Sequence, residues 1–202
     1  MKKIQEILNK KRNILVTGGS GFIGSCLIRK LLNSTDNKIY NLDKMGYASD
    51  NQSIDECLKK NNAYERYKHF KVDLYNFNDV TNVIDHSNPD LIIHLAAESH
   101  VDKSIKNPSN FINSNIIGTF NLLQAVLIHY ESLTKSRKSN FRFHHVSTDE
   151  VFGTLGSKGF FNESTPYDPR SPYSASKAAS DHFVRAWFHT YQIPTIVSNC
   201  SN

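Results

Sequence analysis

Cysteine is scarce in this sequence. The three cysteines, Cys26, Cys57 and Cys200, are odd in number and show neither a CxxC pair nor the spacing of zinc ligands. This excludes a small secreted scaffold held by disulfides and a cysteine-based metal site. We expect a reduced protein that binds no metal.

Long apolar runs are also missing, since no run approaches the length needed to span a membrane. The N-terminus lacks the continuous apolar core and the small-residue cleavage site of a secretory signal. We therefore expect a soluble, cytoplasmic protein without a membrane partner.

The charge surplus is small: 24 Lys and Arg against 19 Asp and Glu give a net charge of +5. The basic residues cluster at positions 2–12 and 135–138, without interleaved aromatics or a nucleic-acid motif. We interpret both clusters as solvated surface and expect no nucleic-acid partner. The 39% hydrophobic content and the length of 202 residues suit one globular domain, residues 1–202.

Short apolar runs alternate with longer helix-like segments. Strands are predicted at 13–17, 38–43, 67–73, 91–95, 141–147 and 194–198, and helices at 22–33, 78–86, 110–130 and 173–191. Such alternation predicts an α/β fold, a doubly wound parallel sheet with helices on both faces. Ligands of such sheets bind at the carboxyl ends of the strands.

A glycine-rich turn is expected where the first strand becomes the first helix. Gly18, Gly21 and Gly24 lie at three-residue spacing within Val16–Gly24, and Gly19, Gly21 and Gly24 fit G-x-G-x-x-G. Positions without side chains let the backbone approach a pyrophosphate, and the helix start supplies N–H donors. The pattern alone is weak, because glycines also make ordinary strand-to-helix turns.

An acid at the end of the second strand strengthens this interpretation. Asp43 follows Gly24 by 19 residues (43 − 24) and is placed to accept a hydrogen bond from an adenosine ribose hydroxyl. It would repel the 2′-phosphate of NADP, so we predict NAD in a Rossmann fold, although Lys44 could soften the discrimination. Asp73 is placed to meet the adenine, but a turn-forming Asp is nearly as good an account.

Tyr173 and Lys177 are four residues apart and share one face of a predicted helix. A nearby lysine and the positive nicotinamide of NAD would favour the phenolate and lower the tyrosine pKa, making a usable base. A lone Y-x-x-x-K is usually a surface pair. After a dinucleotide turn, and after the Ser-Thr pair that ends the fifth predicted strand, the catalytic interpretation is favoured.

The order T-G-G-x-G-F-I-G, L-D-K, H-L-A-A-E-S-H-V-D, S-T-D-E-V-[YF]-G and Y-x-x-x-K resembles that of the sugar-nucleotide 4,6-dehydratases, extended short-chain dehydrogenases/reductases, and particularly those acting on dTDP-glucose. The likeness covers the chain almost from end to end. The glycine turn and Y-x-x-x-K mark only the broad superfamily. Thr148-Asp149-Glu150 narrows it, because related epimerases usually lack the adjacent acids.

The resemblance implies a lyase that converts dTDP-glucose into its 4-keto-6-deoxy product. NAD is reduced transiently at C4, water is eliminated across C5 and C6, and the hydride returns to C6. Tyr173 would take the C4 hydroxyl proton while Thr148 orients that hydroxyl; Glu150 would remove the C5 proton and Asp149 would protonate the departing C6 hydroxyl. A solvated Asp-Glu turn is the structural alternative.

The resemblance also implies the binding residues. Cofactor contacts are expected from Gly18, Gly21, Phe22, Ile23, Gly24, Asp43, Lys44, Asp73, Leu74, Leu95, Ala96, Ala97, Ser99, Tyr173, Lys177 and Asn199. Substrate contacts are expected from Ser99, Thr148, Asp149, Glu150, Tyr173 and Asn202. A homodimer built on two long helices per subunit is implied as well, with 110–130 and 173–191 as the candidates.

Two departures from the family matter. The run Met45-Gly46-Tyr47-Ala48-Ser49 replaces the usual Thr and Ala-Gly, which should perturb the adenosine contacts modestly. Cys200-Ser201-Asn202 resembles the start of a family stretch that leads into the substrate domain, which we expect to be largely absent. A catalytically silent NAD-binding module or partner subunit therefore stays an alternative, as does a related dehydratase or epimerase for another nucleotide sugar.

Overall fold

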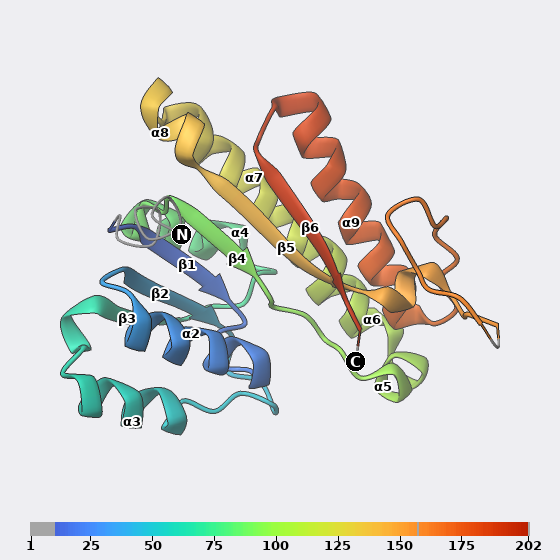
Figure 1. Ribbon diagram of the computed structural model, residues 1–202, viewed down its shortest axis with the longest axis horizontal. Helices are drawn as coiled ribbons and strands as arrows, with labels where there is room; N and C mark the ends of the chain where they lie inside the picture. Colours follow the sequence, from blue (N-terminus) through green and yellow to red (C-terminus); the bar gives the residue numbers. More distant parts are fainter. Residues whose placement is uncertain (1–10, 157, 202) are drawn as a thin grey trace.

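The computed structural model describes residues 11–156 and 158–201, and its centre is one parallel sheet (Figure 1). The six strands lie in the order β3-β2-β1-β4-β5-β6. Their bounds are β1 Asn13–Thr17, β2 Lys38–Asp43, β3 Tyr67–Lys71, β4 Leu91–His94, β5 Arg142–Thr148 and β6 Thr195–Cys200. All five pairings are parallel, as the alternation predicted, so the doubly wound Rossmann-type fold is confirmed.

Four of the six strands differ from the predicted ones by one or two residues at their boundaries. β3 ends at Lys71 and β4 at His94, whereas β5 and β6 run on to Thr148 and Cys200. The extension of β5 and β6 has a common cause: Ser147 pairs with Asn199 and Thr148 with Cys200 in the sheet register. The Ser-Thr segment is therefore still strand, held by its neighbour.

The helices α2 (Phe22–Ser34), α4 (Phe77–Ser87) and α9 (Pro172–Tyr191) match the predicted ones within two residues. Three shorter helices were not predicted: α3 (Gln52–Asn61), α5 (Val101–Lys106) and α8 (Lys135–Asn140). α3 buries only Ile54, Cys57 and Leu58, and α8 buries none of its residues. These segments contain too few regularly spaced apolar residues for the sequence pattern to predict a helix.

The predicted helix 110–130 is three consecutive segments. α6 (Pro108–Phe111) leads into a π-helical segment, η2 (Ile112–Ile117), which continues as α7 (Gly118–Ser132). By length and composition alone, residues 108–132 could cross a membrane, so the expectation that no segment approaches that length was wrong. Half of the apolar window is buried inside this protein, and a core helix passes the same test.

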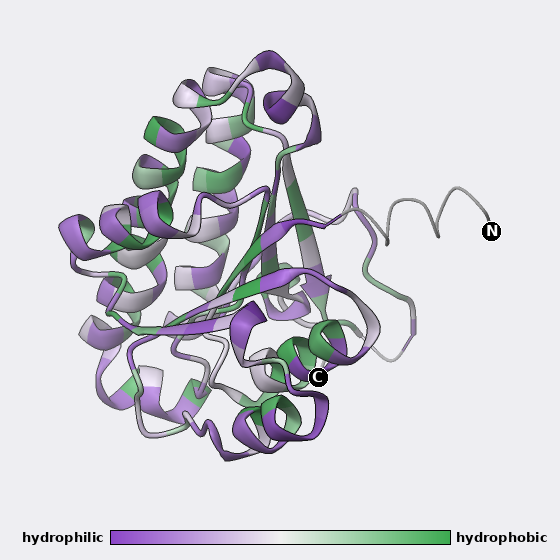
Figure 2. Ribbon diagram, turned by 90° about the vertical axis from the view of Figure 1, so that its left-hand side faces the viewer, coloured by the Kyte–Doolittle hydropathy of each residue, from purple (hydrophilic) through white to green (hydrophobic). Residues whose placement is uncertain are grey.

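The helices cover the sheet in two layers (Figure 1). On one face, α2 and α3 pack on Ile14, Val16 and Ile39. On the other, Leu15 and Leu42 belong to a core shared with α4, α7 and α9. Successive residues of β1 thus enter opposite cores, which explains its unbroken apolar character. Hydrophobic and hydrophilic bands alternate along the helices, as one-sided packing requires (Figure 2).

Candidate active site

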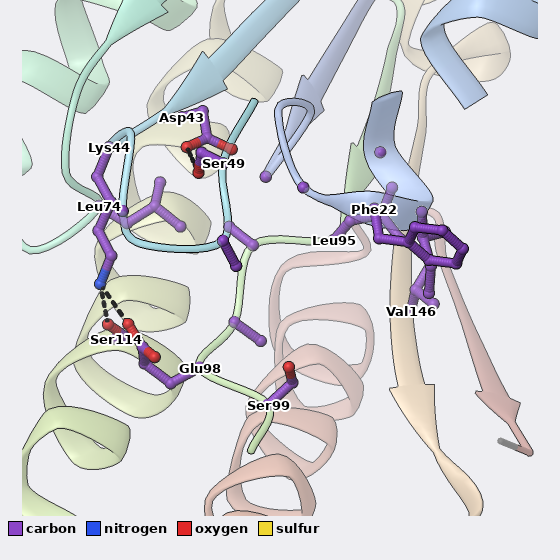
Figure 3. Close-up of a pocket in the computed structure, with 18 of the residues that line it drawn as sticks. Phe22, Asp43, Lys44, Ser49, Leu74, Leu95, Glu98, Ser99, Ser114 and Val146 are labelled. Atoms are coloured by element: carbon purple, nitrogen blue, oxygen red, sulfur yellow. Dashed lines mark hydrogen bonds and ion pairs between the residues drawn. The ribbon is translucent and has the colours of Figure 1, made fainter. Parts of the chain in front are cut away.

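A cleft of about 530 Å³ opens at the carboxyl edge of the sheet. It lies beside β1 and β4, where the strand order reverses, and reaches the ends of β2 and β5. This reversal is where doubly wound sheets bind ligands. Figure 3 shows the cleft bounded by Phe22 and Val146 at one end and by Asp43, Lys44 and Leu74 at the other.

The glycine turn brings backbone against backbone at the cleft floor. Gly18 has φ +69°, and a Cβ there would stand 2.7 Å from Ala96 Cα. A Cβ on Gly24 would stand 2.7 Å from Gly19 Cα, so the start of α2 can pack tightly on the turn. Gly21 caps α2 without a side chain, and Phe22 is 93% exposed. The free N–H groups at this helix start can therefore receive an anion.

Asp43 is buried at the end of β2, and its carboxylate accepts hydrogen bonds from neighbouring groups of the same chain. Oδ2 accepts from the Ser20 N–H at 3.0 Å, and Oδ1 accepts from the Met45 N–H and the Ser49 hydroxyl, each at 2.8 Å. Met45 adopts φ +59°. The run that departs from the family thus folds back onto Asp43, and Ser49 and Tyr47 join the cleft lining.

Lys44 turns its ammonium away from Asp43 and across the cleft. Its Nζ donates to Glu98 Oε1 at 2.8 Å and to Ser114 Oγ at 3.1 Å, as Figure 3 shows. Glu98 lies in the loop after β4, and Ser114 lies in η2. The lysine that could have softened discrimination against NADP is therefore engaged with a carboxylate of its own chain.

Asn115 holds three parts of the site together from the π-helical segment. Its Oδ1 accepts from the Glu98 N–H at 2.8 Å, while its Nδ2 donates to the Glu98 carbonyl at 2.9 Å and to Ser176 Oγ at 2.9 Å. π-helical turns occur frequently at functional sites. Here the turn fixes the loop after β4 against the face of α9 that carries Tyr173 and Lys177.

Tyr173 and Lys177 both reach the cleft from the first turns of α9. Ser171 and Ser174 form a capping box, and Pro172 occupies the first helical turn, so the helix begins just before Tyr173. The buried Tyr173 ring packs edge-on against the buried Phe111 ring, with centroids 6.4 Å apart. Lys177 is buried, and its Nζ donates to the Val146 carbonyl at 3.0 Å.

The pKa of Tyr173 is raised, first by burial and then by the Glu150 carboxylate, while a hydrogen bond to Thr148 opposes the rise. The predicted lowering of the Tyr173 pKa by Lys177 is therefore not observed in the described residues, where burial dominates. Burial lowers the pKa of Lys177 to about 8, and the Asp181 carboxylate opposes that fall.

Asp149 and Glu150 lie in a short 3-10 turn, η3 (Asp149–Phe152), directly after Thr148. Thr148 starts the turn because its side chain accepts from the Glu150 N–H at 3.2 Å. The pKa of Glu150 is raised by burial and next by the neighbouring Asp149 carboxylate. The two acids therefore sit close to Tyr173 but do not themselves line the cleft.

The structure brings most of the predicted residues into one cleft. Lining it are Gly18, Gly21, Phe22, Ile23, Gly24, Asp43, Lys44, Asp73, Leu74, Leu95, Ala96, Ala97, Ser99, Thr148, Tyr173 and Lys177. Asn199 is not among the lining residues; its Nδ2 donates to the Thr148 carbonyl at 3.1 Å. Asp73 also serves as a turn residue, accepting from the Tyr75 N–H at 3.0 Å. Asn202 lies outside the described residues.

Several lining residues were not predicted, among them Ser49, Glu98, Ser114, Val146 and Cys200. Glu98 lies inside the H-L-A-A-E-S-H-V-D motif (residues 94–102) on which the resemblance rested, so that motif could have identified it. Ser114 and Cys200 enter the cleft through the π-helical segment and the extension of β6, neither of which the sequence pattern predicted.

Comparisons with known proteins agree with this geometry. Residues 15–202 match the family model described as GDP-mannose 4,6 dehydratase. A dTDP-glucose 4,6-dehydratase of Escherichia coli is 50% identical over 198 residues, covering 94% of this chain and 54% of the relative.

Two solved structures resemble the fold closely. The dTDP-glucose 4,6-dehydratase of Bacillus anthracis in complex with NAD has a TM-score of 0.78 at 37% identity, covering 94% of this chain and 54% of that one. The Streptomyces venezuelae enzyme of that name, with NAD and TYD bound, has a TM-score of 0.79 at 36% identity, covering 93% and 55%.

The chain spans about half the length of the curated relatives it matches. Within that span the match runs from β1 to the end of the chain, and it includes every motif on which the resemblance rested. The predicted resemblance to sugar-nucleotide 4,6-dehydratases is confirmed: the chain belongs to the GDP-mannose 4,6 dehydratase family.

Proposed function

We propose that this protein is an NAD-dependent lyase that converts dTDP-glucose into dTDP-4-keto-6-deoxyglucose. One observation carries the proposal: a single cleft joins the glycine turn and Asp43 to Thr148, Tyr173 and Lys177. The part of the cleft that would bind the dinucleotide is thus continuous with the part that would transfer protons. The matched relatives with this named activity support the choice of substrate.

The described residues fit NAD. The close approach at Gly18 and Gly24, the uncapped start of α2 and the buried Asp43 suit a pyrophosphate and an adenosine ribose. The rest of the NAD molecule would be flanked by Leu95, Ala96, Ala97 and Ser99. When bound, NAD supplies the hydride acceptor for C4 and the donor for C6. Relatives crystallised with NAD support this assignment.

The chain's own groups then move the protons. Tyr173 would accept the proton of the C4 hydroxyl, with Thr148 orienting that hydroxyl and Lys177 favouring the phenolate. Glu150 would take the C5 proton, because a C4 ketone makes that hydrogen acidic. Asp149 would protonate the C6 hydroxyl as it leaves.

One acid must be protonated while its neighbour is ionised, and adjacent carboxyls separate their pKa values. The pKa of Glu150 is raised by burial and next by Asp149, so the two carboxyls are coupled, but this rise favours the protonated form of Glu150, the residue proposed as the base.

The remaining assignments belong to the same proposal. Residues 1–202 form one NAD-binding domain, Ser99 and Asn202 contact the substrate, and Asn199 lies beside the nicotinamide. The protein is cytoplasmic, binds neither nucleic acid nor membrane, and forms a homodimer through α7 and α9. Ile128 of α7 and Phe188 and Tyr191 of α9 are exposed apolar side chains on these helices.

The test is to incubate the purified chain with NAD and dTDP-glucose and to assay the 4-keto-6-deoxy product by NMR. Product formation supports the proposal. NAD binding without turnover of any nucleotide sugar would instead support a silent NAD-binding module, which the place of Asp149 and Glu150 outside the cleft lining also suits. Turnover of another nucleotide sugar alone would identify a related dehydratase or epimerase.

A further inference from the structure

Asp181 is a fully buried carboxylate for which the proposed reaction has no role. It lies on α9 four residues after Lys177, with an exposure of 0%. Among residues 11–156 and 158–201, Asp43 and Asp181 are the two buried carboxylates. A buried charge costs several kcal/mol unless it is paired and hydrogen-bonded, in an order-of-magnitude sense. Its presence behind the cleft therefore calls for compensating contacts.

Those contacts tie together three parts of the site. Asp181 Oδ2 accepts from Ser147 Oγ at 2.8 Å and from the Tyr167 hydroxyl at 2.8 Å. Ser147 precedes Thr148 at the end of β5. Tyr167 belongs to the loop between η3 and α9, and its ring and hydroxyl are held in turn by Arg185.

The group facing the other oxygen of Asp181 carries no charge at neutral pH. His145 Nε2 lies 3.0 Å from Oδ1, at ion-pair distance but without a well-aligned hydrogen bond. Burial and the nearby Lys177 ammonium lower the pKa of His145 to about 4. The imidazole is therefore neutral and cannot be the counter-charge that a buried carboxylate requires.

Lys177 is a buried cation on the same helix, one turn before Asp181. Its charge acts on His94 from β4 and His145 from β5, and the charges of Asp181 on its own helix and Cys200 from β6 act on it. The Lys177 charge lowers the pKa of both imidazoles, after burial, and so favours their neutral forms. Among the groups that raise the pKa of Lys177 and so favour its ammonium form, the Asp181 carboxylate has the largest effect.

We propose that Asp181 is the positioning residue of this site: its buried carboxylate holds Lys177 as an ammonium and, through Ser147, fixes the strand end that presents Thr148. The inference rests on the proposed function, because Lys177 matters only if it acts on Tyr173 and the cofactor. Asp181 itself touches neither the cleft nor its contents.

A purely structural role makes a different prediction. If Asp181 served only to hold Ser147 and Tyr167, loss of those hydrogen bonds would do the same damage as loss of the charge. Tyr167→Phe and Ser147→Ala remove one bond each and keep the carboxylate. Asp181→Asn keeps the shape and removes the charge, so the two roles separate.

The experiment is a ¹³C NMR titration of the Lys177 side chain in the full chain, assigned with Lys177→Arg, together with the pH dependence of NAD binding. In the unmodified protein Lys177 should be protonated at pH 7. In Asp181→Asn its titration midpoint should fall by about one pH unit or more, the size expected for a buried opposite charge.

NAD affinity at pH 8 should fall about fivefold in Asp181→Asn. The pKa of Lys177 is about 8 in the unmodified chain, so about half of the lysines carry a charge at that pH. A midpoint that is one pH unit lower leaves about a tenth of them charged.

Tyr167→Phe and the surface control Glu131→Gln should leave the Lys177 midpoint in place, and Asp181→Glu should restore it. A folded Asp181→Asn protein with an unmoved midpoint would overturn the inference. So would a neutral Lys177 at pH 7 in the unmodified chain, a result that needs no variant to fold. A chain that binds no NAD, but whose Lys177 midpoint still follows Asp181, would contradict the proposed function and uphold the coupling.

Discussion

The Lys44 ammonium lies 2.8 Å from Glu98 Oε1, so the residue after Asp43, the proposed ribose-binding acid, is neutralised by the loop after β4. Both side chains line the cleft, and Glu98 is the more enclosed, with 16% of its side chain exposed against 38% for Lys44. The pair removes a cation that could otherwise receive a 2′-phosphate.

Glu98→Gln should therefore relax the preference for NAD. Freeing a half-exposed lysine should improve NADP affinity relative to NAD by about two- to fivefold, because exposed ion pairs are worth no more than about 1 kcal/mol. The ratio of the two dissociation constants, measured by calorimetry at low salt, checks this. Glu131→Gln is the matched control, and an unchanged ratio in Glu98→Gln would mean that Lys44 has no part in the selection.

Glu150→Gln should block elimination while leaving the first hydride transfer measurable. The variant keeps the hydrogen-bonding shape but cannot accept the C5 proton, so cofactor should accumulate in its reduced form with dTDP-glucose. Single-turnover absorbance of NADH checks this, with a loss of product of about 100-fold or more as expected for a general base. Loss of both steps together in a folded variant would contradict the assigned role.

On acidification the protein should begin to lose stability at a higher pH than protonation of its carboxylates alone would cause. The folded pKa of His145 is about 4 against an ordinary value of 6.5, because burial disfavours the imidazolium. The unfolded chain therefore binds this proton first, and the stability contributed by neutral His145 is present above pH 6.5 and lost as pH falls toward about 4. Buried His94, whose pKa is also lowered by burial, acts in the same direction.

Urea unfolding followed between pH 7.5 and pH 4 measures this slope. His145→Gln should flatten the curve in that window, whereas the exposed His189→Gln should leave it unchanged. A flat curve for the unmodified chain between pH 6.5 and pH 4 would show that the buried imidazoles do not govern acid stability.

Gly18→Ala should damage both stability and cofactor binding. At φ +69° an alanine is strained, and its Cβ would stand 2.7 Å from Ala96 Cα, so the turn must open. We expect a cost of about 1–3 kcal/mol in unfolding free energy and loss of NAD binding. Gly156→Ala is the control, since a Cβ there meets nothing within 4 Å. Normal NAD affinity in Gly18→Ala would contradict the role of the turn.

The local sequence pattern was enough to predict the parallel sheet and the location of the site. β1 and β4 each contain three consecutive apolar residues, 14–16 and 91–93, and glycines follow β1 where a parallel sheet needs a tight turn. Tyr173 and Lys177 share a helical face by spacing alone. The sequence could not predict α3 or α8, because a helix that buries few residues leaves little periodicity.

The sequence by itself determined the order of strands and helices, the glycine turn, Asp43 and the Tyr173–Lys177 face, because periodicity and backbone constraints act over a few residues. Only the tertiary structure decided that Lys44 pairs with Glu98, 54 residues away, and that Asp181 meets Ser147 and Tyr167 behind the cleft. Such contacts depend on which strand ends lie side by side. Burial then sets the charge states of His145 and Lys177, and burial is a property of the packed fold.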